Sequence, residues 1–189
     1  NRYLPFLYWT VIVATSTAGT TMSDYMDRTL GLGYTVNSDI LISILHEVLA
    51  VWKLTFKDLS VQNIRSKKVE MLYWTAILFS NTLGTAMGDF LADDSGLGFM
   101  GGALLISALL AIVVGLYYFT KISRVTLFWI AFVLTRPFGA TFGDVLTKAK
   151  DKGGLDLGTM GSSAVLFSIL VGFVIYTYFK VKREPTAAV

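Results

Sequence analysis

The chain has 189 residues, of which 54 % are hydrophobic and 15 % are charged, with a formal net charge of +3 and no cysteine. Soluble domains are usually about 45–50 % apolar, so the arrangement of the apolar residues must decide the class of protein. The absence of cysteine excludes a disulfide framework, a CxxC redox pair and a thiolate zinc site. The basic residues stand in short tracts between apolar runs, which is typical of membrane topology, and no nucleic-acid partner is expected.

Six apolar runs follow one another, and each is long enough for a transmembrane helix, which needs about 20 residues to cross roughly 30 Å of hydrocarbon. They predict helices over 4–23, 35–53, 71–89, 99–119, 125–145 and 159–179. The run 35–53 contains Asp39, His46 and Glu47, which other helices must cover if it crosses. The sequence therefore predicts an all-α integral membrane protein, with residues 1–189 as a single transmembrane domain and the lipid bilayer as its partner.

Three stretches of the sequence align without gaps, and each covers two predicted helices. In each stretch a tryptophan lies 15 residues, and a glycine five residues, before an aspartate: Trp9, Gly19 and Asp24; Trp74, Gly84 and Asp89; Trp129, Gly139 and Asp144. A glycine-rich tract follows each aspartate. Three matches in one register predict three tandem parallel repeats of two helices, over approximately 4–64, 69–122 and 123–183.

The basic tracts predict the orientation of the repeats. Two crossings per repeat place all the tracts that follow the repeats on one side: Lys53, Lys57, Arg65, Lys67 and Lys68, then Lys121 and Arg124, then Lys180, Lys182 and Arg183. Lysine and arginine concentrate on the cytoplasmic side, so both ends of this chain are expected in the cytoplasm and the aspartate turns outside. Lys148, Lys150 and Lys152 in the third turn form a discordant minority.

The repeated aspartates Asp24, Asp89 and Asp144 are the main candidates for a functional site. Each ends the first helix of its repeat, where the helix dipole disfavours an acid by roughly 0.3–1 kcal/mol, so helix propensity does not explain them. Parallel repeats about an axis along the membrane normal bring equivalent side chains to one level. Three carboxylates at such short distances from one another would need to be protonated or neutralised by a cation. The alternative is that these aspartates only end turns at the outer interface, where water solvates them.

Neighbouring residues complete the predicted metal site. Asp27 and Asp93 lie just beyond the repeated aspartates, and Met22 and Met87 precede them by two residues. Oxygen ligands suit Mg²⁺, Ca²⁺ and Mn²⁺, and thioethers favour a transition metal, although methionine is also a common core residue. The remaining candidates are small or hydroxyl residues that allow close helix packing or supply oxygen ligands: Gly19, Gly84, Gly139, Thr20, Thr85 and Thr141.

Arg136 lies eight residues before Asp144 inside an apolar run, and Pro137 follows it. A buried arginine in a membrane helix nearly always finds an acidic partner, so we expect Arg136 to pair with Asp24 or Asp89, or to act as an internal cation that displaces a metal. Pro137 removes a backbone hydrogen bond and should kink the helix. Transporters commonly build their sites at such interrupted helices.

Several longer strings carry a resemblance to a known family. They are Tyr73-Trp74-x-Ala76-Ile77-Leu78-Phe79, Leu83-Gly84-Thr85-Ala86-x-Gly88-Asp89, Leu134-Thr135-Arg136-Pro137-x-Gly139-Ala140-x-x-Gly143-Asp144 and Gly153-Gly154-Leu155-x-Leu157-Gly158-Thr159. The sequence resembles a family of bacterial polytopic membrane-anchored proteins with tandem two-helix repeats, which are mostly uncharacterised. The resemblance covers nearly the whole chain. It implies the bacterial inner membrane as the compartment, and four such units, so that one repeat would be missing before Asn1.

The function expected from these residues is transport, and the solute is left open. One hypothesis is a secondary transporter or exporter of a divalent cation, with Mn²⁺ as the best guess and no tightly bound cofactor. A second is a proton-coupled carrier of a small organic solute, and a third is a non-transporting scaffold or sensor. The sequence has no nucleotide-binding loop, no HExxH and no serine nucleophile elbow, so no enzyme is expected. A homo-oligomer is compatible with each hypothesis.

Overall fold

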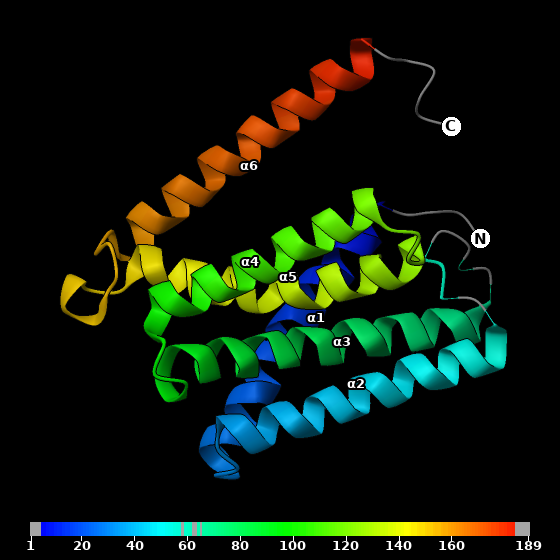
Figure 1. The fold of residues 1–189 in the computed structure, drawn as a ribbon, viewed down its shortest axis with the longest axis horizontal. Helices are drawn as coiled ribbons and strands as arrows, with labels where there is room; N and C mark the ends of the chain where they lie inside the picture. The colour runs from blue at the N-terminus through cyan, green and yellow to red at the C-terminus, as the bar shows by residue number, and fades with distance from the viewer. Residues whose placement is uncertain (1–4, 58, 62–63, 65, 184–189) are drawn as a thin grey trace. The chain divides into compact units, whose positions relative to one another are not determined.

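The structure, a computed structural model, describes residues 5–57, 59–61, 64 and 66–183, and this part of the chain is helical (Figure 1). The α-helices are α1 (Pro5–Asp24), α2 (Tyr34–Phe56), α3 (Lys67–Asp89), α4 (Gly98–Phe119), α5 (Arg124–Thr147) and α6 (Gly158–Arg183). Their ends lie within four residues of the six predicted spans, so the predicted all-helical architecture is confirmed. Arg65, one residue of the first basic tract, lies outside the described residues.

The first helix of each of the first two repeats continues past its aspartate into a π-helical turn. These turns are η1 (Tyr25–Thr29) and η2 (Phe90–Asp94), and they occupy equivalent positions of the repeat. The amides of Leu30 and Ser95 close them by donating to the carbonyls of Tyr25 and Phe90, at 3.0 and 2.9 Å. The glycine tracts then supply positive φ angles, 74° at Gly33 and 65° at Gly98, which other residues rarely adopt.

Three of the helices in the described part of the chain are long and apolar enough to cross a membrane: α4, α5 and Gly158–Tyr176 of α6. The helices α1, α2 and α3 are of similar length, but their hydropathy and charge do not make them candidate membrane spans. In α1 the hydroxyls of Thr15, Thr17 and Thr21 donate to carbonyls one turn back, which meets their hydrogen-bonding need inside the helix. In α2, Asp39, His46 and Glu47 are exposed and are not covered by other helices. Crossing by these three helices stays a prediction.

The chain divides into two compact units, Asn1–Phe142 and Gly143–Val189, which we describe separately. The second unit holds the end of α5, the short 3₁₀ turn η3 (Lys150–Lys152) and α6. There the hydroxyl of Thr147 donates to the hydroxyl oxygen of Ser162 at 2.9 Å, and the amide of Leu155 donates to the carbonyl of Val145 at 2.7 Å. The first bond joins α5 to α6, and the second holds the segment after η3 against α5.

The core of the first unit forms where α3 packs against α2 and meets α5. α3 contacts both α1 and α2. The buried cluster consists of Leu41, Leu45 and Trp52 of α2, Ala76, Leu83 and Ala86 of α3, and Trp129 of α5. The rings of Trp52 and Trp129 meet edge to face with their centroids 5.6 Å apart, and Nε1 of Trp129 donates to the carbonyl of Leu59 at 3.2 Å. Trp9, the equivalent of Trp129, is 63 % exposed, so the repeated tryptophans do not share one role.

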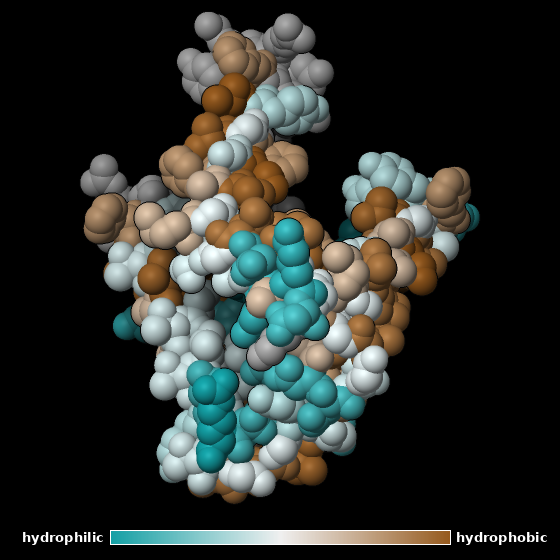
Figure 2. Space-filling model, turned by 90° about the vertical axis from the view of Figure 1, so that its left-hand side faces the viewer, coloured by the Kyte–Doolittle hydropathy of each residue, from teal (hydrophilic) through white to brown (hydrophobic). Residues whose placement is uncertain are grey.

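Most of the acidic residues in the turns of the first unit lie at the opposite end of the helices from Lys67 and Arg124, and Arg28 and Glu70 are exceptions to this separation of charge. Asp27, Asp93 and Asp94 lie in the turns that join α1 to α2 and α3 to α4, whereas Lys67 and Arg124 begin α3 and α5. Figure 2 looks at the molecule from the end that carries these turns, and hydrophilic side chains gather on it. This separation agrees with the predicted clustering of basic residues on one side of a membrane.

The equivalent glycines of α3 and α5 differ in their surroundings, which generates a prediction. A Cβ added to Gly84 would collide with the Cβ of Arg136, whereas one added to Gly139 would meet no other described atom within 4 Å. We expect Gly84→Ala to cost about 1–3 kcal/mol, because α3 and α5 must separate. Gly139→Ala should be neutral or stabilising, since alanine favours a helix over glycine by about 0.5–1 kcal/mol. Thermal unfolding of the purified protein in detergent measures both, and equal losses would contradict this packing.

Candidate functional site

A polar cavity of about 240 Å³ lies where α1, α3 and α5 meet in the first unit. It is lined by Ser16, Thr20, Asn81, Gly84, Thr85, Arg136 and Ala140. Five of these side chains carry hydrogen-bonding groups, and one of the five is a cation. The cavity is smaller than the roughly 300–1,000 Å³ of sites for drug-sized ligands, so it fits a small solute.

The lining residues occupy equivalent positions of the three repeats. Ser16, Asn81 and Arg136 each lie eight residues before the repeated aspartate, and Thr20, Thr85 and Ala140 each lie four residues before it. The same face of the first helix of each repeat therefore borders the cavity. This is the arrangement expected when parallel repeats surround a common axis.

Close contacts at glycine bring these helices together, and the same contact occurs twice. A Cβ added to Gly19 of α1 would lie 2.7 Å from the Cβ of Asn81 in α3. A Cβ added to Gly84 of α3 would collide with the Cβ of Arg136 in α5. In both cases the glycine of one repeat contacts the residue eight before the aspartate of the next repeat. Gly19 and Gly84 thus serve helix packing. Gly139, the equivalent glycine of the third repeat, makes no such contact with the described residues.

Arg136 is half-buried in α5 and has no ion-pair partner among the described residues. Its guanidinium carbon lies 5.2 Å from the centroid of the Phe132 ring, and its Nε is buried without a hydrogen-bond partner in that part of the chain. The predicted pairing of Arg136 with Asp24 is wrong, because the base beside Asp24 is Arg28, whose Nη2 lies 3.7 Å from Oδ1 of the aspartate. Local geometry decides this pairing, since residues four apart are neighbours on a helix surface.

Asn81 is the second residue of the cavity lining with buried polar atoms that lack a hydrogen-bond partner among the described residues. Its side chain is 5 % exposed, and neither Nδ2 nor Oδ1 has a hydrogen-bond partner among the described residues. Leaving a buried polar group unpaired costs roughly 1–3 kcal/mol, so α3 carries this amide against its own stability. The hydroxyl oxygens of Thr20 and Thr85 lie 3.4 Å apart beside it, within hydrogen-bond distance. The cavity therefore offers buried atoms of Arg136 and Asn81 that are unpartnered among the described residues, beside two hydroxyls that donate to the carbonyls of Ser16 and Asn81.

The repeated aspartates lie beyond this cavity and differ in their neighbours. In the first repeat Asp24 lies beside Arg28, and in the second unit Oδ1 of Asp144 lies 3.8 Å from Nζ of Lys148. At the equivalent position the second repeat has Asp93, one turn after Asp89. Two of the three repeats thus provide a base beside the aspartate, and the second repeat provides another acid.

The charged residues of the first two turns act electrostatically on Tyr34, the first residue of α2, where Arg28 opposes the effect of the acids. Burial raises the pKa of the Tyr34 phenol, and the negative charges of Asp89, Asp27 and Asp93 raise this pKa further. These three carboxylates therefore act on one spot. Over the residues that the structure describes, however, no three histidine or acidic side chains lie close enough together to hold a metal ion.

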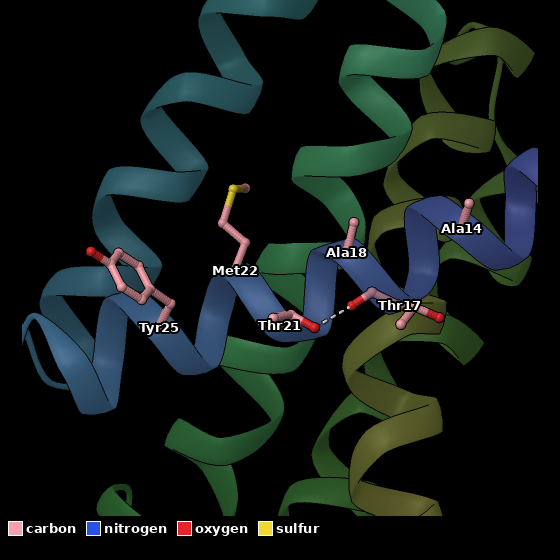
Figure 3. Close-up of a pocket in the computed structure, with 6 residues that line it drawn as sticks. All are labelled: Ala14, Thr17, Ala18, Thr21, Met22 and Tyr25. Carbon is pink, nitrogen blue, oxygen red and sulfur yellow. Dashed lines mark hydrogen bonds between the residues drawn. The ribbon is translucent and has the colours of Figure 1, made fainter.

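The other predicted site residues lie away from the polar cavity. Met22 lines a shallow groove on α1 with Ala14, Thr17, Ala18, Thr21 and Tyr25, as Figure 3 shows. Met87 is half-buried on α3 and is not part of the cavity lining. Thr141 is buried, and its hydroxyl donates to the carbonyl of Pro137 at 2.9 Å, within α5. Sequence reasoning missed Ser16, Asn81 and Ala140, although the register of Arg136 within its repeat would have identified them.

Three tandem copies of a two-helix unit, with three candidate membrane spans, define the class of this protein as a helical repeat protein suited to a membrane. The chain belongs to the family described as Repeat of Unknown Function (DUF347), which matches residues 7–58, 72–123 and 127–183. The three matches fall on the three predicted repeats. No curated protein and no solved structure matches the chain.

The unpaired amide of Asn81 leads to a stability prediction. We expect Asn81→Leu, which removes two unpaired buried polar atoms, to raise the thermal midpoint, corresponding to roughly 1–3 kcal/mol. Asn37→Leu is the comparison variant, because Nδ2 of the buried Asn37 donates to the carbonyl of Ser23 at 3.4 Å and only its Oδ1 lacks a partner among the described residues, so its midpoint should rise less than that of Asn81→Leu or fall. If both substitutions destabilise the protein alike, Asn81 is not unpaired.

Proposed function

We propose that this protein is a multi-pass membrane carrier that binds a small organic solute in the cavity between α1, α3 and α5. The observation that carries the proposal is the combination of Arg136 and Asn81, both with unpartnered buried atoms, on the lining of one cavity. Arg136 lies within α5, a helix apolar enough to cross a membrane. Ionisable groups inside membrane helices are costly and mark solute pathways.

The charge of the cavity favours an organic solute over a metal cation. Its only ionisable lining residue is Arg136, so a divalent cation would meet a positive charge and no carboxylate. A solute with hydrogen-bonding groups, by contrast, would satisfy the Asn81 amide and the hydroxyls of Thr20 and Thr85. The lining therefore supports the second of the transport hypotheses.

Protons are the coupling ion that we propose, and the acidic turns are the place where they would enter. Asp27, Asp89 and Asp93 act together on Tyr34 at one end of the first unit. Carboxylates at a helix end can exchange protons with water and so link solute movement to a proton gradient. In this proposal the protein lies in a bacterial inner membrane with the basic ends of its helices towards the cytoplasm.

A carrier of divalent cations, with Mn²⁺ foremost, is the second candidate. The acidic character of the first two turns, where Asp27, Asp89 and Asp93 all raise the pKa of Tyr34, favours it, since carboxylate oxygens suit Mn²⁺. A cation site there would require these side chains to move closer together than the described structure holds them.

Transport is tested with the purified full chain in proteoliposomes that enclose a pH-sensitive dye. We expect one class of small organic solute, from a panel of organic acids, amino acids, sugars and amines, to change the internal pH. The change should be absent in protein-free vesicles and in vesicles with Asn81→Leu, because that variant lacks the amide of the cavity. If no solute of the panel moves, either by dye or by radiolabel, the carrier proposal is wrong.

Thermal unfolding in the presence of Mn²⁺ distinguishes the carrier of an organic solute from the carrier of a divalent cation. We expect MnCl₂ to shift the midpoint no more than MgCl₂ does, because the described acidic residues do not form a metal site. Asp89→Asn and Asp24→Asn form the matched pair, since Asp24 already has Arg28 beside it. A stabilisation specific to Mn²⁺ that Asp89→Asn abolishes and Asp24→Asn retains would favour the cation carrier instead.

A further inference from the structure

We propose that the cavity recognises a small carboxylate that carries a hydroxyl or amino group next to its carboxyl group, with Arg136 and Asn81 as the recognition residues. This inference rests on the proposed carrier function and names its solute class. It follows from the charge, the unpaired atoms and the size of the cavity, which are taken in turn.

The charge of the cavity favours a ligand that carries a carboxylate. Arg28 pairs with Asp24 and Lys148 pairs with Asp144, and Arg136 belongs to neither of these two pairs. A guanidinium inside a group of membrane helices is stable only when a negative charge compensates it. Because the lining contains no acidic side chain, a bound anion is the group that would supply this charge.

The geometry of the guanidinium selects a planar oxyanion. Arginine presents its N–H groups in a rigid planar fork that matches a carboxylate. The ring of Phe132 lies 5.2 Å from the guanidinium carbon, and the buried Nε is unpartnered among the described residues. An Nε–H without a protein acceptor is the donor that a carboxylate oxygen would accept from.

The amide of Asn81 adds a second requirement. It carries a donor and an acceptor, and both are buried without a partner in the described part of the chain. A carboxylate satisfies the donor only, because it has no hydrogen to give. A hydroxyl or amino group on the neighbouring carbon would donate to the amide oxygen, so 2-hydroxy and 2-amino acids satisfy both ends of Asn81.

The size of the cavity limits the ligand to a small acid. About 240 Å³, shared by side chains of three helices, accommodates a molecule of a few non-hydrogen atoms. The hydroxyls of Thr20 and Thr85 donate to the carbonyls of Ser16 and Asn81, so they would have to rotate away from these carbonyls to donate to the second carboxylate oxygen.

The test measures the thermal midpoint of the purified full chain in detergent at constant ionic strength. The probes are the sodium salts of L-lactate, propionate, phosphate and sulfate, together with L-alanine. We expect a saturable rise with L-lactate or L-alanine, and a weaker one with propionate, which has the size of lactate but lacks the hydroxyl donor. A rise only with phosphate or sulfate, or equal rises with lactate and propionate, overturns the assignment. If no probe raises the thermal midpoint, the cavity holds only water, and the assignment is likewise wrong.

Variants connect the response to the two residues. We expect Arg136→Gln to raise the apparent Kd of the effective probe at least ~10-fold, because a charge-assisted hydrogen bond is lost. Arg124→Gln, at the exposed start of the same helix, should leave this Kd unchanged. Should Arg136→Gln not fold, Asn81→Asp carries the test. Its carboxylate would share the cavity with Arg136, raise the midpoint without ligand and abolish the response. A lower midpoint with the response retained contradicts the assignment.

Transport of the same probes separates this inference from the function on which it rests. If L-lactate or L-alanine binds but neither this probe nor any other solute crosses the proteoliposome membrane, the carrier function is wrong and the site belongs to a sensor. If a solute without a carboxylate crosses equally well in the wild type and in Arg136→Gln, the carrier stands and the carboxylate assignment is wrong.

Discussion

The contact of one helix with the next at glycine is the interaction on which the candidate site depends. Gly19 allows the Cβ of Asn81 to approach the backbone of α1. In the same way, Gly84 allows the Cβ of Arg136, from α5, to approach the backbone of α3. Since these contacts fix the base of each polar side chain, its functional groups have a defined position in the cavity. The opposite side of α3 packs with α2 in a dense apolar core around Trp52, so the helix that carries Asn81 is held on both sides.

The three copies of the repeat share a helical arrangement, but they carry different side chains at equivalent positions. The position eight residues before the aspartate is occupied by serine, asparagine and arginine in the three copies, and the position four residues after it by Arg28, Asp93 and Lys148. Equivalent backbones therefore place three unlike side chains around one cavity. They also place a base one turn after Asp24 and Asp144, but an acid one turn after Asp89. Any transport cycle must arise from these differences, because the helices themselves are alike.

Much of the fold could be predicted from the sequence. Apolar runs set the helices, and the glycines with positive φ, such as Gly33 and Gly98, mark where the second helices begin. The register of Asp24, Asp89 and Asp144 predicted that these aspartates converge on one site, whereas the residues that line a common cavity are Ser16, Asn81 and Arg136. At 100° per residue, an offset of eight residues turns a side chain by about 80° around the helix. A repeat identifies equivalent positions, but it does not reveal which face of the helix points inward.

The unlike lining of the cavity has a consequence for the shape of what it can hold. Ser16, Asn81 and Arg136 approach from three separate helices, and each offers a different chemistry. A molecule with a stereocentre meets these three groups in one order, and its mirror image meets them in the reverse order. Three unlike contacts around one cavity therefore give this site a way to distinguish a chiral ligand from its mirror image.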